Sequence, residues 1–419
     1  MFLISMTGFS NQAISILTNL MTSDLRPLLG LKKAWDKFMD ALILGNHTQG
    51  LGIVRSLSDL DLSVHMLNDS KHSVVRFSKH LQKYHSIKKG SFENLHTTQG
   101  INYLVDTLLS IRHPSKKVLL FCTNEDLTNA IYSRRDDLRH CYYIPNNNII
   151  PIIDKFIFYN TISAISLLTP VTYVMSNMNV SDLDEDSRYI CKGRLGSSFK
   201  LKTGKKAIEF SKNQYDSIID YVSKKLHPDE IVVQAKIENN DRVYSSCGFS
   251  IDGSIIQEFQ YLKLRQFPAG FGTGTYLESV RNEKLTSAAA MIIKEFEYTG
   301  IFELEFLTYE NSIMVLEMNP RTWKSINFAT DCGQNLVASY ACYGLNGVKP
   351  EASSEYKTGL TWAHIVADIT SCLSSGTLPK YRPNTKFAVF ALEDPLPFLF
   401  EIATMPILYW ERIRKLFRK

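Results

Sequence analysis

An acidic segment near residue 310 carries side chains of the types that can bind a divalent cation. Gly300–Arg321 reads as two strands, Phe302–Leu307 and Ser312–Met318, joined by a polar turn. Side chains alternate across a strand, so Glu303 and Glu305 should lie opposite the apolar side chains of the first strand. A carboxylate among apolar neighbours is costly unless it is paired or binds a cation. The pattern therefore indicates a binding site.

The second strand supplies further oxygen ligands. Its alternation predicts that Ile313, Val315 and Glu317 share one face. Asn319 continues this face just past the strand end. With Glu305, these carboxylate and amide oxygens suit Mg²⁺, which takes a few protein oxygens and fills its other positions with water and phosphate. The alternative is an ordinary hairpin with salt-bridged acids on a wet face.

The order of these residues resembles the metal-binding signature of the ATP-grasp superfamily. Glu317-Met-Asn-Pro-Arg321 ends a strand whose acid follows Glu305 by twelve residues, and the segment 322–336 is similar to the one after the metal strand in that family. The resemblance implies that Glu305, Glu317 and Asn319 hold two Mg²⁺ ions, or Mn²⁺, on the phosphates of ATP. Arg321 would clamp the transferring group through paired hydrogen bonds.

Two lysines and a glycine-rich turn upstream have the composition of a phosphate site. Lys155 opens a helix, and Lys192 ends a short strand before the turn GRLGSS. Glycine and serine let backbone N–H groups approach phosphate oxygens, and lysine supplies a compact charge. The resemblance implies that Lys155, Lys192, Ser197 and Ser198 contact ATP under a flexible flap. A solvated surface lysine is the alternative for Lys155.

The strand at 230–237, EIVVQAKI, resembles the hinge that reads the adenine edge in this family. The hinge residues would be Gln234, Ala235, Lys236 and Ile237. Glutamine replaces the usual glutamate, and its amide can both donate and accept a hydrogen bond. Asp241 is a further candidate for a polar contact nearby.

Arg265 is a candidate for the reaction centre. It alternates with Leu264, which predicts that Lys263 and Arg265 share a face. The resemblance implies that Arg265 neutralises an acyl phosphate or orients the acceptor carboxylate. Basic residues on an exposed strand face are the alternative. The following glycine-rich turn at 270–275 is either a substrate loop or a tight reversal.

The elements that position these residues predict an α/β fold that is α+β in its catalytic part. A strand, turn, helix and strand from Ala41 to Leu67, with a further strand ending at Cys122, predict an open parallel sheet. The resemblance implies an ATP-grasp fold preceded by a Rossmann-like pre-ATP-grasp domain. We expect a helical extension at 1–40, the pre-ATP-grasp domain at 41–148, the ATP-grasp domain at 149–345 with its flap at about 172–233, and a C-terminal region at 346–419.

Two polar residues at predicted strand ends, His47 and Asp69, are candidate substrate contacts, and the alternative for each is a turn-capping side chain. The dinucleotide fingerprint G-x-G-x-x-G is absent from the first turn, which disfavours a Rossmann oxidoreductase.

Composition excludes several classes of partner. The net charge of +5 is spread among acids along most of the chain, so nucleic-acid binding is not expected. Seven cysteines without a CxxC pair favour reduced thiols in a cytoplasmic protein. No apolar run is long enough to span a membrane. The basic amphipathic helix at 406–419 either packs on the body or attaches peripherally to the inner membrane face, and an oligomer is left open.

The expected activity is an ATP-dependent carboxylate–amine ligase that joins small molecules through an acyl phosphate. A carboxylate–thiol ligase, a phosphotransferase and an ATP-binding module without turnover are the alternatives on the same scaffold. In the tail, Trp362, Asp368 and Asp394-Pro-Leu-Pro397 resemble a branch of ATP-grasp ligases related to D-aspartate ligases and predicted carboligases.

Overall fold

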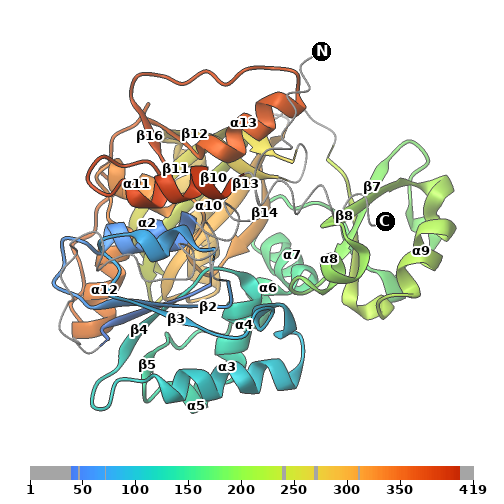
Figure 1. Ribbon diagram of the computed structural model, residues 1–419. Coiled ribbons are helices and arrows are strands. Elements are labelled where there is room, and N and C mark those ends of the chain that lie inside the picture. The colour runs from blue at the N-terminus through green and yellow to red at the C-terminus, as the bar shows by residue number, and fades with distance from the viewer. Residues whose placement is uncertain are drawn as a thin grey trace, which may run out of the picture.

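The computed structural model describes residues 39–45, 48–70, 72–237, 242–268, 272–309 and 312–405. Almost all of the predicted extension at 1–40, the predicted basic helix at 406–419, His47 and Asp241 lie outside these residues. The described chain forms three sheets with helices around them (Figure 1). This arrangement confirms the predicted mixed α/β class. None of its described helices is long and apolar enough to cross a membrane.

The first sheet is parallel throughout, in the order β3-β2-β1-β4-β5. Its strands β1 and β4 are continuous apolar runs because both faces of the sheet are covered: Ile43 packs into one hydrophobic core and its neighbour Leu44 into another. The strands are β1 (Ala41–Leu44), β2 (Val64–Asn68), β3 (Lys83–Ser86), β4 (Val118–Cys122) and β5 (Tyr142–Tyr143). The helices are α2 (Thr48–Ser56), α3 (Thr98–Ser110), α4 (Glu125–Ser133) and α5 (Arg135–Leu138).

A large sheet carries the acidic hairpin, in the order β14-β13-β10-β11-β12-β15-β16, and it is antiparallel except for its last pair. The strands are β10 (Val243–Ile251), β11 (Ser254–Phe267), β12 (Thr273–Val280), β13 (Gly300–Tyr309), β14 (Ser312–Asn319), β15 (Thr361–Ala363) and β16 (Thr385–Phe387). The glycine-rich turn predicted at 270–275 is therefore partly strand, because β12 begins at Thr273.

Helices around the large sheet fix the orientation of the hairpin. Phe302, Leu304 and Phe306 of β13 pack into one core with α7 and α10. This burial sets the register, since a slip by one residue would turn Glu305 into that core. The helices of this part are α6 (Ile150–Ile153), α7 (Lys155–Ala164), α10 (Glu283–Glu295), α11 (Ile326–Asp331), α12 (Leu336–Asn346) and α13 (Ile365–Ser374).

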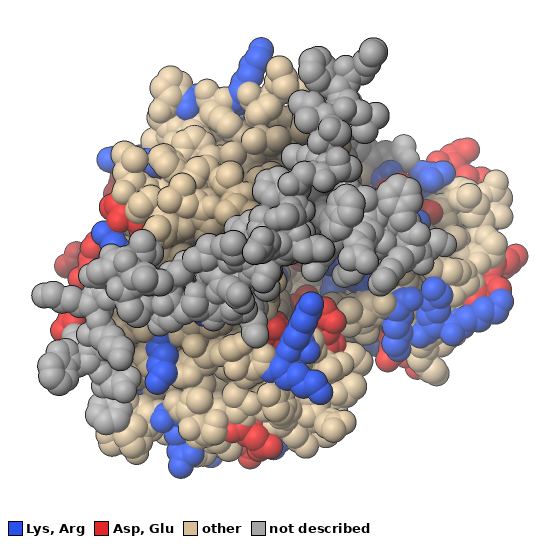
Figure 2. Space-filling view, in the orientation of Figure 1, with Lys and Arg blue, Asp and Glu red and all other residues tan. Residues whose placement is uncertain are grey.

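A four-stranded unit projects from the rest of the molecule at the right of Figure 1. Its strand order is β6-β9-β7-β8, and its apolar side chains form a core of their own. The predicted flap hairpin is confirmed as β7 paired antiparallel with β8. Figure 2 shows basic side chains gathered over this unit, whose exposed lysines include 200, 202, 205 and 206. Its elements are β6 (Thr172–Val174), β7 (Arg188–Gly193), α8 (Ser198–Thr203), β8 (Ala207–Ser211), α9 (Tyr215–Ser223) and β9 (Ile231–Ala235).

Candidate nucleotide and metal site

The acids of the hairpin lie opposite each other on adjacent strands. Glu305 pairs in register with Glu317, and Glu303 pairs with Asn319. Side chains directly opposite in an antiparallel pair are neighbours on one face of the sheet. The Asn319 amide donates to Glu317 Oε1 at 3.2 Å. The structure thus brings the three predicted metal ligands together.

A β-bulge at Leu316 corrects the predicted face pattern of β14. The register passes from Glu305 opposite Glu317 to Phe306 opposite Val315, which leaves Leu316 without a partner in β13. Val315 therefore lies in the apolar core, and Glu317 lies on the other face. The prediction that Val315 and Glu317 share a face was wrong, because one extra residue shifts the alternation.

Glu303 and Arg321 hold the Asn319 side chain from two sides. Asn319 Nδ2 donates to Glu303 Oε2 at 3.0 Å, and Arg321 Nη2 donates to Asn319 Oδ1 at 2.7 Å. The Tyr261 hydroxyl donates to the other oxygen of Glu303. Burial and then the charge of Glu305 raise the pKa of Glu303 to about 7. Arg321 also donates to the Thr322 carbonyl at 2.8 Å, so its guanidinium is fixed beside the acids.

Lys263 reaches the acids from β11, a contact that the sequence did not reveal. Its ammonium lies 2.7 Å from Glu305 Oε2. Desolvation opposes the charge on this lysine, but Glu305 and Glu303 outweigh it and raise its pKa. A lysine between two leucines of this strand was the available signal. The sequence pattern favours Arg265 instead, because its position resembles that of the expected basic residue.

Arg265 lies against a different partner. Its Nε and Nη2 donate to the two oxygens of Asp368 at 2.9 and 2.6 Å, and its guanidinium stacks over Tyr276. The strands shift register on both sides of Arg265. These irregularities turn Lys263 and Arg265 toward different groups. Within the described chain, the structure therefore does not bring Arg265 together with the metal acids.

The two candidate phosphate lysines converge on the same acids. Lys192 donates to Gln234 Oε1 at 2.9 Å and lies near the Tyr159 hydroxyl at 3.4 Å. Burial and then the charge of Lys155 lower the pKa of Lys192 to about 8. The solvent-exposed Glu317 lies among these cations: desolvation opposes its charge, but Lys155, Lys263, Lys192 and Arg321 outweigh it and lower its pKa.

The hinge residues extend from the buried end of β9. Gln234 is buried and donates to Thr172 Oγ1 at 2.8 Å, in addition to its contact with Lys192. The backbone N–H groups of Ala235 and Lys236 donate to Val171 and Arg188 carbonyls at 3.0 and 2.8 Å. The Lys236 side chain pairs with Glu209 at 2.8 Å, and Ile237 is half-buried.

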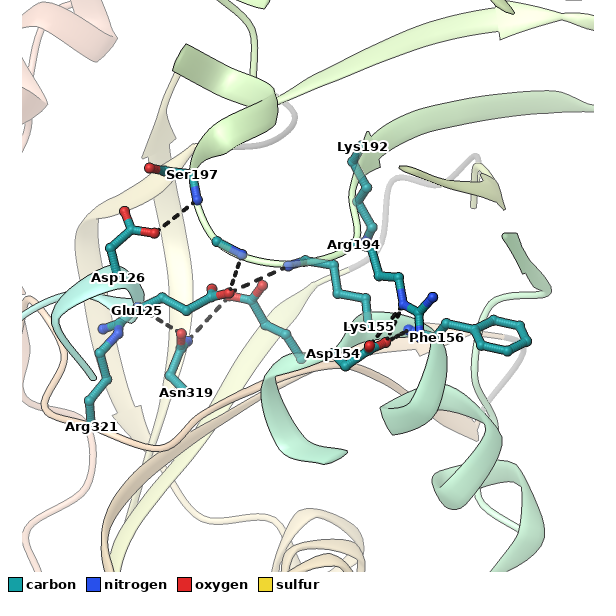
Figure 3. Close-up of polar contacts among 12 residues, drawn as sticks. Glu125, Asp126, Asp154, Lys155, Phe156, Lys192, Arg194, Ser197, Asn319 and Arg321 are labelled. Carbon is teal, nitrogen blue, oxygen red and sulfur yellow. Dashed lines mark hydrogen bonds and ion pairs between the residues drawn. The ribbon is translucent and has the colours of Figure 1, made fainter. Parts of the chain in front are cut away.

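The glycine-rich turn packs against the first sheet. Backbone N–H groups of Gly196 and Ser197 each donate to a carboxylate of α4, and Ser198 begins α8 (Figure 3). These acids, Glu125 and Asp126, had no predicted role. Asp69, which follows β2 at the carboxyl edge of the same sheet, accepts from the Phe92 N–H at 3.1 Å, at the start of a short 3-10 helix.

The structure is similar to solved synthetase and carboxylase structures over most of its length. N5-carboxyaminoimidazole synthetase from Staphylococcus aureus complexed with ADP has a TM-score of 0.56 and 12% identity, covering 79% of this chain and 83% of that one. The chain has the ATP-grasp fold. Biotin carboxylase from Campylobacter jejuni, solved as a β-γ-ATP complex, has a TM-score of 0.58 and 11% identity, with coverages of 80% and 75%.

A third similar structure is the biotin carboxylase domain of 2-oxoglutarate carboxylase from Hydrogenobacter thermophilus, in complex with MgADP, ADP and bicarbonate. It has a TM-score of 0.58 and 12% identity, covering 78% of this chain and 74% of that one. No protein-family model and no curated protein matches the sequence. The likeness is therefore one of fold.

The donor set of this site suits Mg²⁺, an ion that enzymes often hold jointly with a nucleotide. No group of three or more His, Cys, Asp or Glu side chains in the described part of the chain is arranged to hold a metal. The two facing carboxylates of Glu305 and Glu317 and the Asn319 oxygen leave room in the coordination sphere for water and phosphate. Mg²⁺ is usually held in this way by enzymes that use nucleotides.

Proposed function

We propose that the protein is an ATP-dependent ligase that joins a small-molecule carboxylate to an amine and releases ADP and phosphate. The observation that carries the proposal is the facing pair of Glu305 and Glu317, ringed by Lys155, Lys192, Lys263 and Arg321. Facing acids with cations around them bind a metal and a polyphosphate together. The ADP, ATP and MgADP complexes of the similar structures support ATP and Mg²⁺ as its cosubstrate and cofactor.

The proposed reaction has two steps. A carboxylate oxygen of the acid attacks the γ-phosphorus, the bond to the β–γ bridging oxygen breaks, and ADP leaves an acyl phosphate. The amine nitrogen then attacks the acyl carbon, phosphate leaves, and the nitrogen loses a proton to give the amide. A pair of Mg²⁺ ions held by Glu305, Glu317 and Asn319 would neutralise phosphate charge in the first step.

The residues of this chain would act by positioning and by charge. Lys155, Lys192 and the turn with Ser197 and Ser198 would bind the phosphates, and the hinge from Gln234 to Ile237 would hold the base. Arg321 already donates to Asn319 Oδ1, so it orients that ligand as well as placing a positive charge beside the acids. Such positioning supplies most of the catalysis in phosphoryl transfer.

The finer assignments extend the same proposal. The D-aspartate ligase-like subtype rests on the resemblance in the tail, where Asp394 is buried and accepts from Arg55 and Ser78. We also propose that Mn²⁺ can replace Mg²⁺ and that the protein acts in the cytoplasm or at the inner membrane face.

A substrate screen tests the proposed function. Amino acids and sugar acids are paired with amines, and phosphate release from Mg·ATP is measured, followed by mass spectrometry of the product. The proposal expects a product whose mass equals acid plus amine minus water. A thioester or a phosphorylated product would instead identify a thiol ligase or a phosphotransferase. ATP binding without ADP production in every combination would identify a binding module.

The low pKa of Lys192 predicts the pH dependence of nucleotide binding. Burial and Lys155 lower this pKa to about 8, so the ammonium loses its proton where an ordinary lysine keeps it. We expect the affinity for Mg·ATP, measured by calorimetry, to fall as the pH rises through 8. Lys192→Arg stays charged and should bind equally at pH 7 and pH 9, because a guanidinium titrates only above about pH 12. An identical decline in both proteins would contradict this assignment.

A further inference from the structure

Two carboxylates at the start of helix α4 accept hydrogen bonds from backbone N–H groups of the glycine-rich loop. Glu125 and Asp126 form the first turn of α4, just after the end of β4. Gly196 N–H donates to Glu125 Oε1 at 2.8 Å, and Ser197 N–H donates to Asp126 Oδ1 at 3.1 Å. Figure 3 shows both contacts joining α4 to the loop. The donors are the groups that the proposed function assigns to phosphate.

The Glu125 carboxylate has the surroundings of a bound phosphate oxygen. The Lys155 ammonium is 3.9 Å from the same oxygen that accepts from Gly196. Figure 3 shows the Glu125 and Lys155 side chains pointing toward each other. Desolvation opposes the charge of Lys155, but Glu125 and then Glu317 outweigh it and raise its pKa. Backbone N–H groups beside an ammonium form an anion site.

The loop fits closely onto these acids. Gly196 has a φ of +56°, a backbone conformation that residues with a side chain rarely adopt. A Cβ at this position would lie 2.7 Å from Asp126 Oδ1. The loop is also anchored beside Gly193, where Arg194 Nε donates to the Asp154 carboxylate at 2.8 and 3.0 Å. The contact is therefore specific to this loop conformation.

We propose that Glu125 and Asp126 latch the glycine-rich loop, so that the triphosphate of ATP must displace them in order to bind. This inference rests on the proposed function. One N–H group cannot serve a carboxylate and a phosphate oxygen at full strength, so the two anions compete. The acids belong to α4, the helix that follows β4 of the first sheet, and the loop belongs to the four-stranded unit. The latch ties that unit to the body, and it weakens ATP binding by the free energy of the contacts that are lost.

Nucleotide affinity is the first test. The double variant Glu125→Gln, Asp126→Asn keeps the size of both side chains and removes their charge. The control, Asp136→Asn, removes the charge of an acid on α5 that is 85% exposed and paired only with Arg139 at 3.4 Å in the described chain. We expect the double variant to bind Mg·ATP about tenfold more tightly by calorimetry, because charge-assisted hydrogen bonds are lost from the competing state. Unchanged or weaker binding would overturn the proposal.

Protection of the loop from trypsin is the second test. It is needed because the loss of two negative charges would by itself strengthen the binding of an anion such as ATP. Lys200 and Lys202 lie on α8, just after the latched residues, and are exposed. Without nucleotide, the double variant should be cleaved there about tenfold faster than the natural protein and the control, since local opening governs cleavage. Saturating Mg·ATP should restore protection. Tighter ATP binding with unchanged cleavage would reject the latch.

The two tests also separate the latch from the proposed function. If the natural protein binds no ATP, the proposed function fails, whereas faster cleavage of the double variant would still support a latched loop. If ATP binds and both measurements match the control, only the latch fails.

Discussion

Glu317→Gln is expected to lower ATP-dependent ADP release by about a thousandfold, which corresponds to ~4 kcal/mol of transition-state stabilisation. Glu317 faces Glu305 across the hairpin, and four cations lower its pKa against the opposing effect of desolvation. Glutamine keeps an oxygen that can accept from Asn319 but loses the charge that attracts a metal. Release is measured with a coupled ADP assay at saturating substrate.

The fold should survive this substitution, because the Glu317 side chain is exposed to solvent. Circular dichroism and the urea midpoint should match those of the natural protein. Glu295→Gln is the control, since Glu295 is an exposed acid on α10, the helix behind the opposite face of the hairpin. Full turnover by the Glu317 variant would reject the assignment of Glu317 to a metal site.

Arg265→Met is expected to lower the free energy of unfolding by about 3 kcal/mol, the cost of leaving a buried carboxylate without its partner. Asp368 is fully buried, and without Arg265 it would keep the Thr275 hydroxyl, at 2.8 Å, as a hydrogen-bond donor. Urea denaturation monitored by tryptophan fluorescence gives the change.

The reciprocal substitution, Asp368→Asn, should lower the free energy of unfolding by clearly less than Arg265→Met does. The Arg265 side chain is 28% exposed and stacks over Tyr276, so water can solvate its charge. An Arg265→Met protein that keeps its stability but has lost turnover would contradict this structural role. It would restore the role at the reaction centre that the resemblance implied for Arg265.

The acidic hairpin could be predicted because its signals are local. Alternation within Phe302–Leu307 placed Glu303 and Glu305 on one face, and the core that forms behind Phe302 and Phe306 is consistent with this. The parallel first sheet followed from the order of strand, turn, helix and strand between Ala41 and Leu67, with a further strand that ends at Cys122. The positions of residues whose environment depends on near neighbours in the sequence could therefore be predicted.

Contacts that depend on distant strands could not be predicted. The bulge at Leu316 depends on how β14 pairs with β13, and the same sequence would alternate regularly in another register. Lys263 and Arg265 are both basic residues of β11, and only the folded sheet decides which one meets Glu305. Glu125 meets the glycine-rich loop across seventy-one residues of chain, a separation that no local pattern reports.

The division of the hydrophobic cores determines which part of the molecule can move. One core contains Ile43 and Phe121 of the first sheet together with Phe249 and Trp362 of the large sheet, so rotation of one sheet against the other would break a continuous apolar contact. The four-stranded unit has a separate core, and Val315 N–H donates to the Leu168 carbonyl next to its entry segment at 2.8 Å. The two larger sheets are therefore held together by one continuous hydrophobic core. The four-stranded unit shares no residue of this core, so it is the part of the described chain that can move without breaking that contact.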